Sequence, residues 1–186
     1  MKEDYVISEI SLEDTQSFMQ SEHYLQDIFG KKSQWITHKC YGLFQRSPEF
    51  NHDKLVGAVQ YCSYNFGGDN KRFHQEHYGC HTEDCEGFWE IARLAVSPSD
   101  EHNITSWFLS RTIKMIDAKV IVTVADMKLH EGTIYSATNF DYYGWMQDRV
   151  YGDEVSAYHV YLKVFDKDIE CKWEKKDLTN QRFVRY

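Results

Sequence analysis

Four polar residues occupy places in the chain where reactive side chains are expected. Arg93 lies inside the apolar run 88–96, and Asp126 directly follows the apolar run 120–125. His130 and Tyr135 come shortly afterwards. Carboxylates at the ends of buried strands in open α/β sheets face the ligand crevice. This set predicts anion binding by the guanidinium and proton transfer by the other three groups.

Each of these residues also has a structural alternative. Arg93 is either an anion-binding group or half of an ion pair with Asp126, because an unpaired buried guanidinium is expensive. Asp126 accepts a proton from an amine, binds a metal, or forms that ion pair. His130 shuttles protons or ligates a metal, or is an ordinary surface histidine. Tyr135 is a general acid or a packed ring.

A second group of candidates surrounds the start of a predicted helix. Asn103 is a candidate N-cap, and Ser106 falls in the first turn, where unpaired amides and the helix dipole favour an anion. Simple capping is the alternative role for Ser106. The predicted cofactor-binding set is Arg93, Ala95, Asn103 and Ser106.

The polar stretch 67–87 contains several metal-binding residue types close together. Their spacing fits no standard zinc finger, and a polar loop with unligated thiols is the alternative to a metal site. The candidate ligands are His74, His77, Cys80, His81 and Cys85.

The charge of the chain is unevenly distributed. The 186 residues carry a net charge of −8, which by itself disfavours a nucleic-acid partner. Residues 29–48, however, contain four basic residues and no acid, and residues 163–186 carry a net charge of +2. Both segments also contain aromatic residues, a combination that suits phosphate contact and base stacking. A solvated charged face is the alternative.

Composition and pattern predict an α/β protein with a single domain over 1–186 and a central mixed sheet flanked by helices. Hydrophobic residues make up 42% of the chain, which is globular composition, and no apolar run could span a bilayer. Five cysteines and an acidic N-terminus without a signal segment predict a reduced, cytoplasmic setting. The predicted order is β-α-β-β-β-α-β-α-β, with strands at 6–10, 35–45, 54–64, 88–96, 120–125 and 158–165, and helices at 11–28, 103–117 and 129–138.

The strand–helix–strand–helix arrangement over 88–138 resembles the GNAT acyltransferase superfamily. That resemblance implies a donor bound between two splayed strands. The usual glycine-rich phosphate loop is absent, because Ser99-Asp100-Glu101-His102-Asn103-Ile104 stands in its place. The donor is therefore left unidentified, with an acyl-CoA-like molecule as one option.

Motifs spread over residues 21–144 are similar to those of the Mom family of bacteriophage DNA-modification proteins, which are divergent GNAT members. The matching parts are His23-Tyr24, the arginine of Glu90-Ile91-Ala92-Arg93, Ser106, and Ala125-Asp126 followed by His130-Glu131-Gly132-Thr133-Ile134-Tyr135. The resemblance implies modification of adenine N6 in double-stranded DNA to a carbamoylmethyl (acetamido) form that protects phage DNA from host restriction. The predicted substrate-binding residues are His23, Tyr24, Lys31, Lys32 and Trp35, with helix packing as the alternative role for His23 and Tyr24.

Adenine N6 must leave the base stack to reach an active centre, so exposed aromatics are needed to receive it. Trp35, Trp89, Tyr143 and Trp145 are candidates. Two other functions stay open: acyl transfer to a small amine or protein, and a non-catalytic accessory role in binding a host partner. The oligomeric state is open as well, a dimer included.

Overall fold

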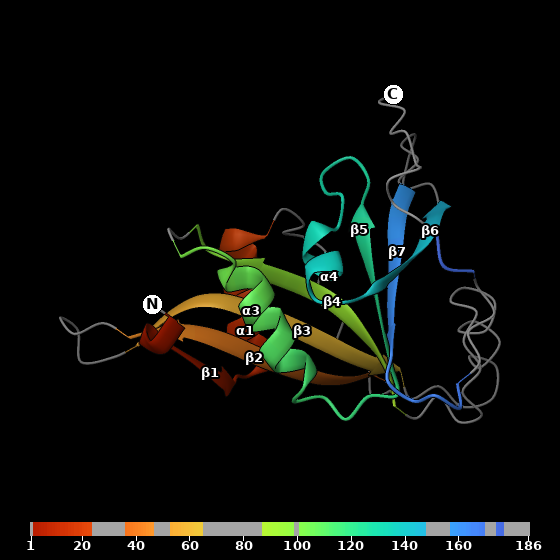
Figure 1. Ribbon diagram of the computed structural model, residues 1–186. Coiled ribbons are helices and arrows are strands. Elements are labelled where there is room, and N and C mark those ends of the chain that lie inside the picture. Colours follow the sequence, from red (N-terminus) through yellow and green to blue (C-terminus); the bar gives the residue numbers. More distant parts are fainter. Residues whose placement is uncertain are drawn as a thin grey trace. The chain divides into compact units, whose positions relative to one another are not determined.

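The computed structural model of the chain describes residues 2–23, 36–46, 53–64, 87–98, 101–147, 157–169 and 174–176. Its seven strands follow the order β1-β2-β3-β4-β5-β7-β6 in a mixed sheet (Figure 1). The chain divides into two compact units, Met1–Asn65 with Trp89–Ala118 and Phe66–Phe88 with Lys119–Tyr186. A single domain over 1–186 stays a prediction.

The first unit holds an antiparallel sheet built from four strands. Register pairs such as Tyr41 with Val59 and Ala58 with Ala95 join neighbouring strands. β4 contributes all of its residues except Phe88 to this unit. The strands are β1 (Tyr5–Glu9), β2 (Ile36–Gln45), β3 (Lys54–Tyr64) and β4 (Phe88–Val96).

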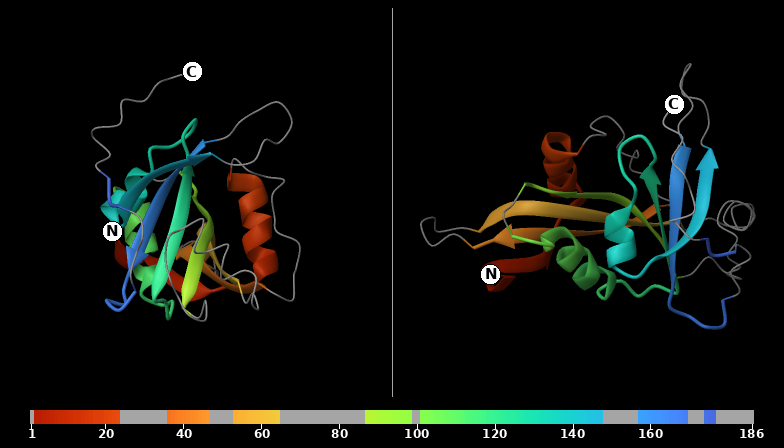
Figure 2. Two further views of the ribbon diagram at one scale, coloured as in Figure 1. Left: turned by 90° about the vertical axis from the view of Figure 1, so that its right-hand side faces the viewer. Right: turned by 45° about the horizontal axis from the view of Figure 1, so that its top comes forward.

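Helix α1 (Leu12–Glu22) covers one face of this sheet (Figure 2). Ser11 caps it, since the Ser11 hydroxyl accepts a hydrogen bond from the Asp14 amide at 3.0 Å. Met19 is completely buried and packs with Ala58 and Ala95 of β3 and β4. This contact buries the apolar side of a helix that is otherwise polar.

Helix α3 (Ile104–Ile113) covers the opposite face (Figure 2). Phe108 and Leu109 are completely buried. The hydroxyls of Tyr61 on β3 and Thr112 on α3 lie 2.8 Å apart, both in fully buried side chains. A polar pair thus fixes the position of α3 on an otherwise apolar surface.

The described residues of the second unit form three further antiparallel strands and one short helix. β5 (Val120–Asp126) pairs with β7 (Ala157–Val164), which pairs with β6 (Asp141–Gln147). Helix α4 (Thr133–Ala137) lies between β5 and β6 in the chain. The core of the unit consists of Phe88, Val120, Val122, Tyr143, Val160 and Leu162.

Several predicted element boundaries are wrong. The first helix ends at Glu22, because His23 takes an extended conformation, rather than continuing to Ile28. The third predicted helix is only α4, and β6 was not predicted at all. The apolar runs at β4 and β5 were predicted correctly, since nearly every side chain in β5 is buried.

No helix in the described ranges is long and apolar enough to cross a bilayer.

Candidate active site

Asp126 begins a tight turn that carries His130 in the second unit. The Asp126 carboxylate accepts a hydrogen bond from the Lys128 amide at 2.9 Å, and its carbonyl accepts one from the His130 amide at 2.8 Å. His130 is exposed and lies in this turn, not at a helix start as predicted. The two residues are therefore fixed relative to each other by backbone hydrogen bonds, with the imidazole open to solvent.

Gly132 links this turn to α4. Its φ of +66° lies in the left-handed region, where glycine is favoured. A side chain there would also collide with Tyr161, because a Cβ atom would lie 2.6 Å from Tyr161 Cζ. Gly132 precedes α4 and leaves room for an aromatic ring.

Tyr135 lies on α4 with a half-buried ring. The ring centroid is 5.8 Å from that of Phe140 and 5.4 Å from that of Tyr161. Its carbonyl accepts a hydrogen bond from the Phe140 amide at 3.0 Å. The packed ring was the structural alternative for Tyr135. Such packing also orients the hydroxyl, so both roles are compatible.

Tyr161, a buried tyrosine, contacts this segment, and sequence reasoning missed both it and the neighbouring pair of Tyr142 and His159. Tyr161 on β7 donates its hydroxyl hydrogen to the Glu131 carbonyl at 2.5 Å. Tyr142 on β6 shares a 2.9 Å hydrogen bond with His159 Nδ1. Burial raises the pKa of both phenols, that of Tyr142 to about 12, and lowers the pKa of His159. The three groups are neutral at physiological pH.

Arg93 and Ala95 lie on β4 in the first unit. Arg93 is half-buried, pairs in register with Gln60, and donates from Nη1 to the Ala92 carbonyl at 2.5 Å. The Ala95 side chain packs with Met19, so its direct role is in joining α1 to the sheet.

Asn103 and Ser106 lie at the start of α3. Asn103 occupies the N-cap position with φ +60° and makes no side-chain capping bond, contrary to the usual pattern for this residue. The Ser106 hydroxyl donates to the Asn103 carbonyl at 3.1 Å. Among the described residues, the amides of Thr105 and Ser106 reach no backbone carbonyl. Two amide donors and the helix dipole therefore converge there.

A buried polar cluster on β2 and β3 was also missed. His38 Nδ1 lies 3.2 Å from Cys62 Sγ and 3.1 Å from Gln60 Nε2. Burial raises the pKa of the Cys62 thiol to about 12, with Glu90 adding to the effect, and lowers the pKa of His38. The pair is therefore neutral rather than a thiolate–imidazolium pair. Only the strand register reveals it, because these residues are far apart in the sequence.

Other predicted residues are buried or lie outside the described ranges. His23 is buried at the end of α1. Trp89 and Tyr143 are also buried, so the prediction that they stack on a base is wrong, whereas Trp145 is 56% exposed. Outside the described residues lie Tyr24, Lys31, Lys32, Trp35, His74, His77, Cys80, His81 and Cys85. Within the described part, no cluster of three metal-binding side chains occurs.

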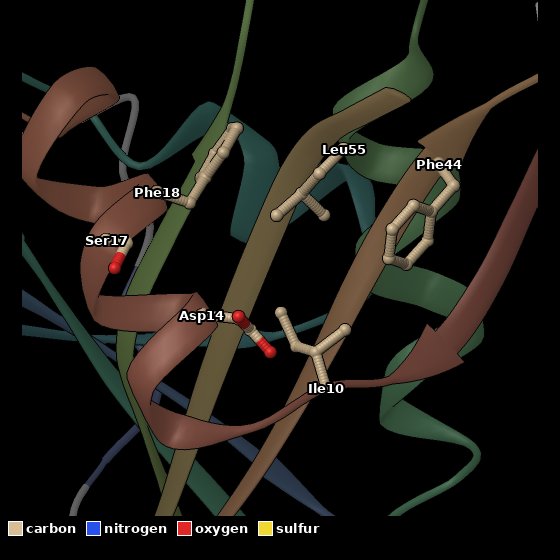
Figure 3. A pocket seen from close by; sticks show the side chains of 6 residues that line it. All are labelled: Ile10, Asp14, Ser17, Phe18, Phe44 and Leu55. Atoms are coloured by element: carbon tan, nitrogen blue, oxygen red, sulfur yellow. The ribbon is translucent and has the colours of Figure 1, made fainter. Parts of the chain in front are cut away.

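A groove of about 400 Å³ lies elsewhere in the first unit, between α1 and the sheet (Figure 3). Its walls are mainly the apolar side chains of Phe18, Phe44 and Leu55, with Asp14 at the rim. None of the predicted site residues lines it.

Residues 4–185 match the model of the Mom protein family. No curated protein matches the chain. The fold is similar to a probable acetyltransferase from Staphylococcus epidermidis ATCC 12228, with 12% identity and a TM-score of 0.56, covering 87% of this chain and 99% of that one. NAA60 of Arabidopsis thaliana, solved with acetyl-CoA, is 10% identical with a TM-score of 0.57. The match covers 87% of this chain and 99% of that one. The putative acetyltransferase yncA of Salmonella typhimurium, also solved with acetyl-CoA, is 10% identical with a TM-score of 0.55. The match covers 88% of this chain and 95% of that one.

Proposed function

The chain belongs to the Mom protein family, and from this membership we propose that it attaches a carbamoylmethyl group to N6 of adenine in DNA. The observation that carries the proposal is the family match over 4–185. The acetyltransferase fold supports it, since that fold is built for transfer of a small group to an amine.

Adenine N6 is a poor nucleophile because its lone pair is delocalised into the ring. A new N6–carbon bond therefore needs a base that removes one N6 proton and an acid that protonates the leaving group. The segment from Asp126 to Tyr135 offers a carboxylate, a solvent-accessible imidazole and an oriented phenol. We assign proton removal to Asp126, a proton-shuttle role to His130 in the same turn, and proton donation to Tyr135.

The fold implies an acyl-CoA-like donor, and the start of α3 fits the anionic part of such a molecule. The amides of Thr105 and Ser106 would hold a phosphate there, and Ser106 is fixed by its bond to Asn103. A bound thioester would supply a carbonyl carbon, which suits acyl transfer to an amine, whereas the carbamoylmethyl product needs a donor whose methylene carbon carries the leaving group. The glycine-rich loop is missing, so this chain has fewer backbone donors than the usual phosphate site.

Contact with DNA is proposed through the basic segments and Trp145. Trp145 is exposed on β6, where an extruded base could stack on its indole. Lys176 lies beside the preceding Gly144 and supplies a cation for a phosphate. The acidic remainder of the chain predicts weak, salt-sensitive binding, which suits an enzyme that must leave each modified site.

Mass spectrometry of nucleosides from the DNA of expressing cells tests this proposal. The expected result is a deoxyadenosine that carries the mass of a carbamoylmethyl group. An unchanged adenine pool, with the protein soluble and abundant, contradicts it.

Acyl transfer to a small amine or protein is the second candidate, favoured by the acetyl-CoA complexes among proteins of similar fold. Acetyl-CoA binding measured by calorimetry, together with an unchanged adenine pool, would support it. A non-catalytic accessory role predicts instead that Asp126→Asn and Tyr135→Phe leave the biological effect intact.

A further inference from the structure

We propose that Tyr161 is a positioning residue that holds the segment His130–Tyr135 in its reactive arrangement. Tyr161 does not belong to the predicted site, and it lies far along the chain on β7. The effect of Tyr161 on catalysis rests on the proposed function, whereas its role in holding the segment in place does not.

Tyr161 contacts the segment at three successive points. Its hydroxyl donates to the Glu131 carbonyl at 2.5 Å. Its ring occupies the volume of the missing Gly132 side chain, with a Cβ position there 2.7 Å from the Tyr161 hydroxyl. The ring centroid also lies 5.4 Å from that of Tyr135. One side chain therefore touches the residue after His130, the glycine that precedes α4, and the tyrosine on α4.

The hydroxyl acts as a hydrogen-bond donor throughout the ordinary pH range. Burial raises the pKa of Tyr161 above its usual value, so the phenol stays protonated. The phenol hydrogen is donated to the Glu131 carbonyl. Moderately alkaline pH therefore leaves the phenol protonated and its bond to the Glu131 carbonyl intact.

Tyr161 is held rigidly because β7 pairs with a strand on each side, β5 and β6. Tyr161 is completely buried and pairs in register with Thr123 of β5 and Tyr142 of β6. Its ring also lies 5.2 Å from that of Tyr142. Displacement of Tyr161 would disrupt its packing against both neighbouring strands. The bond from Tyr161 to Glu131 therefore ties the exposed turn that carries His130 to the buried sheet.

The test compares Tyr161→Phe with Tyr142→Phe. Both variants keep the ring and lose one buried hydroxyl, but only the first loses the bond to Glu131. The readout is the initial rate at which adenine becomes modified in cells, at equal amounts of soluble protein. A loss of about ten- to a hundredfold is expected for Tyr161→Phe, because small misplacements of reactive groups cost rates of that order. Tyr142→Phe should stay within about twofold of wild type.

A double variant separates positioning from general support of the fold. If Tyr161 acts through Tyr135, then Tyr161→Phe added to Tyr135→Phe causes no further loss. A further loss would place the effect of Tyr161 on His130 as well, whereas equal activities of Tyr161→Phe and Tyr142→Phe would overturn the inference.

Amide hydrogen exchange tests the mechanical role without any reaction. The His130 and Tyr135 amides are bonded to the carbonyls of Asp126 and Gly132. Their exchange should accelerate at least tenfold in Tyr161→Phe and stay unchanged in Tyr142→Phe. Equal exchange in both variants contradicts the inference. If wild-type protein modifies no adenine, the proposed function fails, and the exchange result alone decides whether Tyr161 holds the segment.

Discussion

The ring of Tyr161 fills the space that a side chain on Gly132 would need. A Cβ atom on Gly132 would lie 2.6 Å from Tyr161 Cζ and 2.7 Å from its hydroxyl oxygen. The positive φ of Gly132 excludes ordinary residues for a second, independent reason. The turn between Asp126 and α4 therefore depends on a glycine at this one position.

Gly132→Ala should lower the free energy of unfolding by at least about 2 kcal/mol, since left-handed strain and the clash with Tyr161 add together. Urea unfolding at neutral pH measures the change. Thr133→Ala, at the exposed neighbouring position, is the matched control and should change stability by less than about 0.5 kcal/mol. Equal stability of the two variants would show that the segment adapts freely.

The half-buried His38 and the fully buried His159 predict a loss of stability in mild acid. The pKa values of His38 and His159 are both lowered by burial from the ordinary value of 6.5. The unfolded chain then binds more protons than the folded protein below about pH 6.5, so their stabilising contribution is complete above that pH and declines as the pH falls. Chemical unfolding across this range should show the decline, and His159→Gln should reduce its slope. A pH-independent free energy of unfolding would contradict the neutral state of these rings.

Cys62 should be an inert thiol in the folded protein. Its side chain is 4% exposed, and its pKa is raised from 9.0 to about 12, so the thiolate is about a thousandfold scarcer than in the unfolded chain. Peptide-resolved mass spectrometry after alkylation at neutral pH measures its reaction. We expect slow labelling in native protein and rapid labelling in urea. Fast native labelling would mean that the His38 contact produces a thiolate.

The hydroxyl pair between Tyr61 and Thr112 should stabilise the packing of α3. Thr112→Val keeps the shape but removes the 2.8 Å bond, which should cost about 1–2 kcal/mol. In a double-mutant cycle with Tyr61→Phe, the coupling should be about 1 kcal/mol. Fully additive effects would show that the pair contributes nothing as a bond.

Side-chain type and periodicity predicted the parts of the fold in which local pattern and burial agree. The run Val120–Ala125 is almost wholly apolar, and it forms the buried strand that such a run indicates. The strand β6 was missed because Gly144, with φ +104°, interrupts its pattern at a register shift between Tyr142 and Trp145. The early end of α1 was missed because the apolar spacing continues past Glu22, where the helix stops.

In the candidate site too, local pattern predicted some residues, whereas others are brought into place only by the fold. Asp126 was placed correctly at a strand end from its position after an apolar run. Tyr161 carried no such signal, because it is one of thirteen tyrosines and acts through contacts that only the fold creates. The approach of His38 to Cys62 likewise depends on a cross-strand register that the sequence does not encode locally.

The nucleoside composition of DNA from expressing cells tests the central claim most directly. Wild-type protein should produce deoxyadenosine bearing a carbamoylmethyl group at N6. Asp126→Asn retains an oxygen that can accept the Lys128 amide bond, and Tyr135→Phe retains the ring packing, yet each should reduce the modified fraction at least tenfold. Unmodified adenine with abundant soluble wild-type protein, or equal modification by wild type and both variants, would contradict the account.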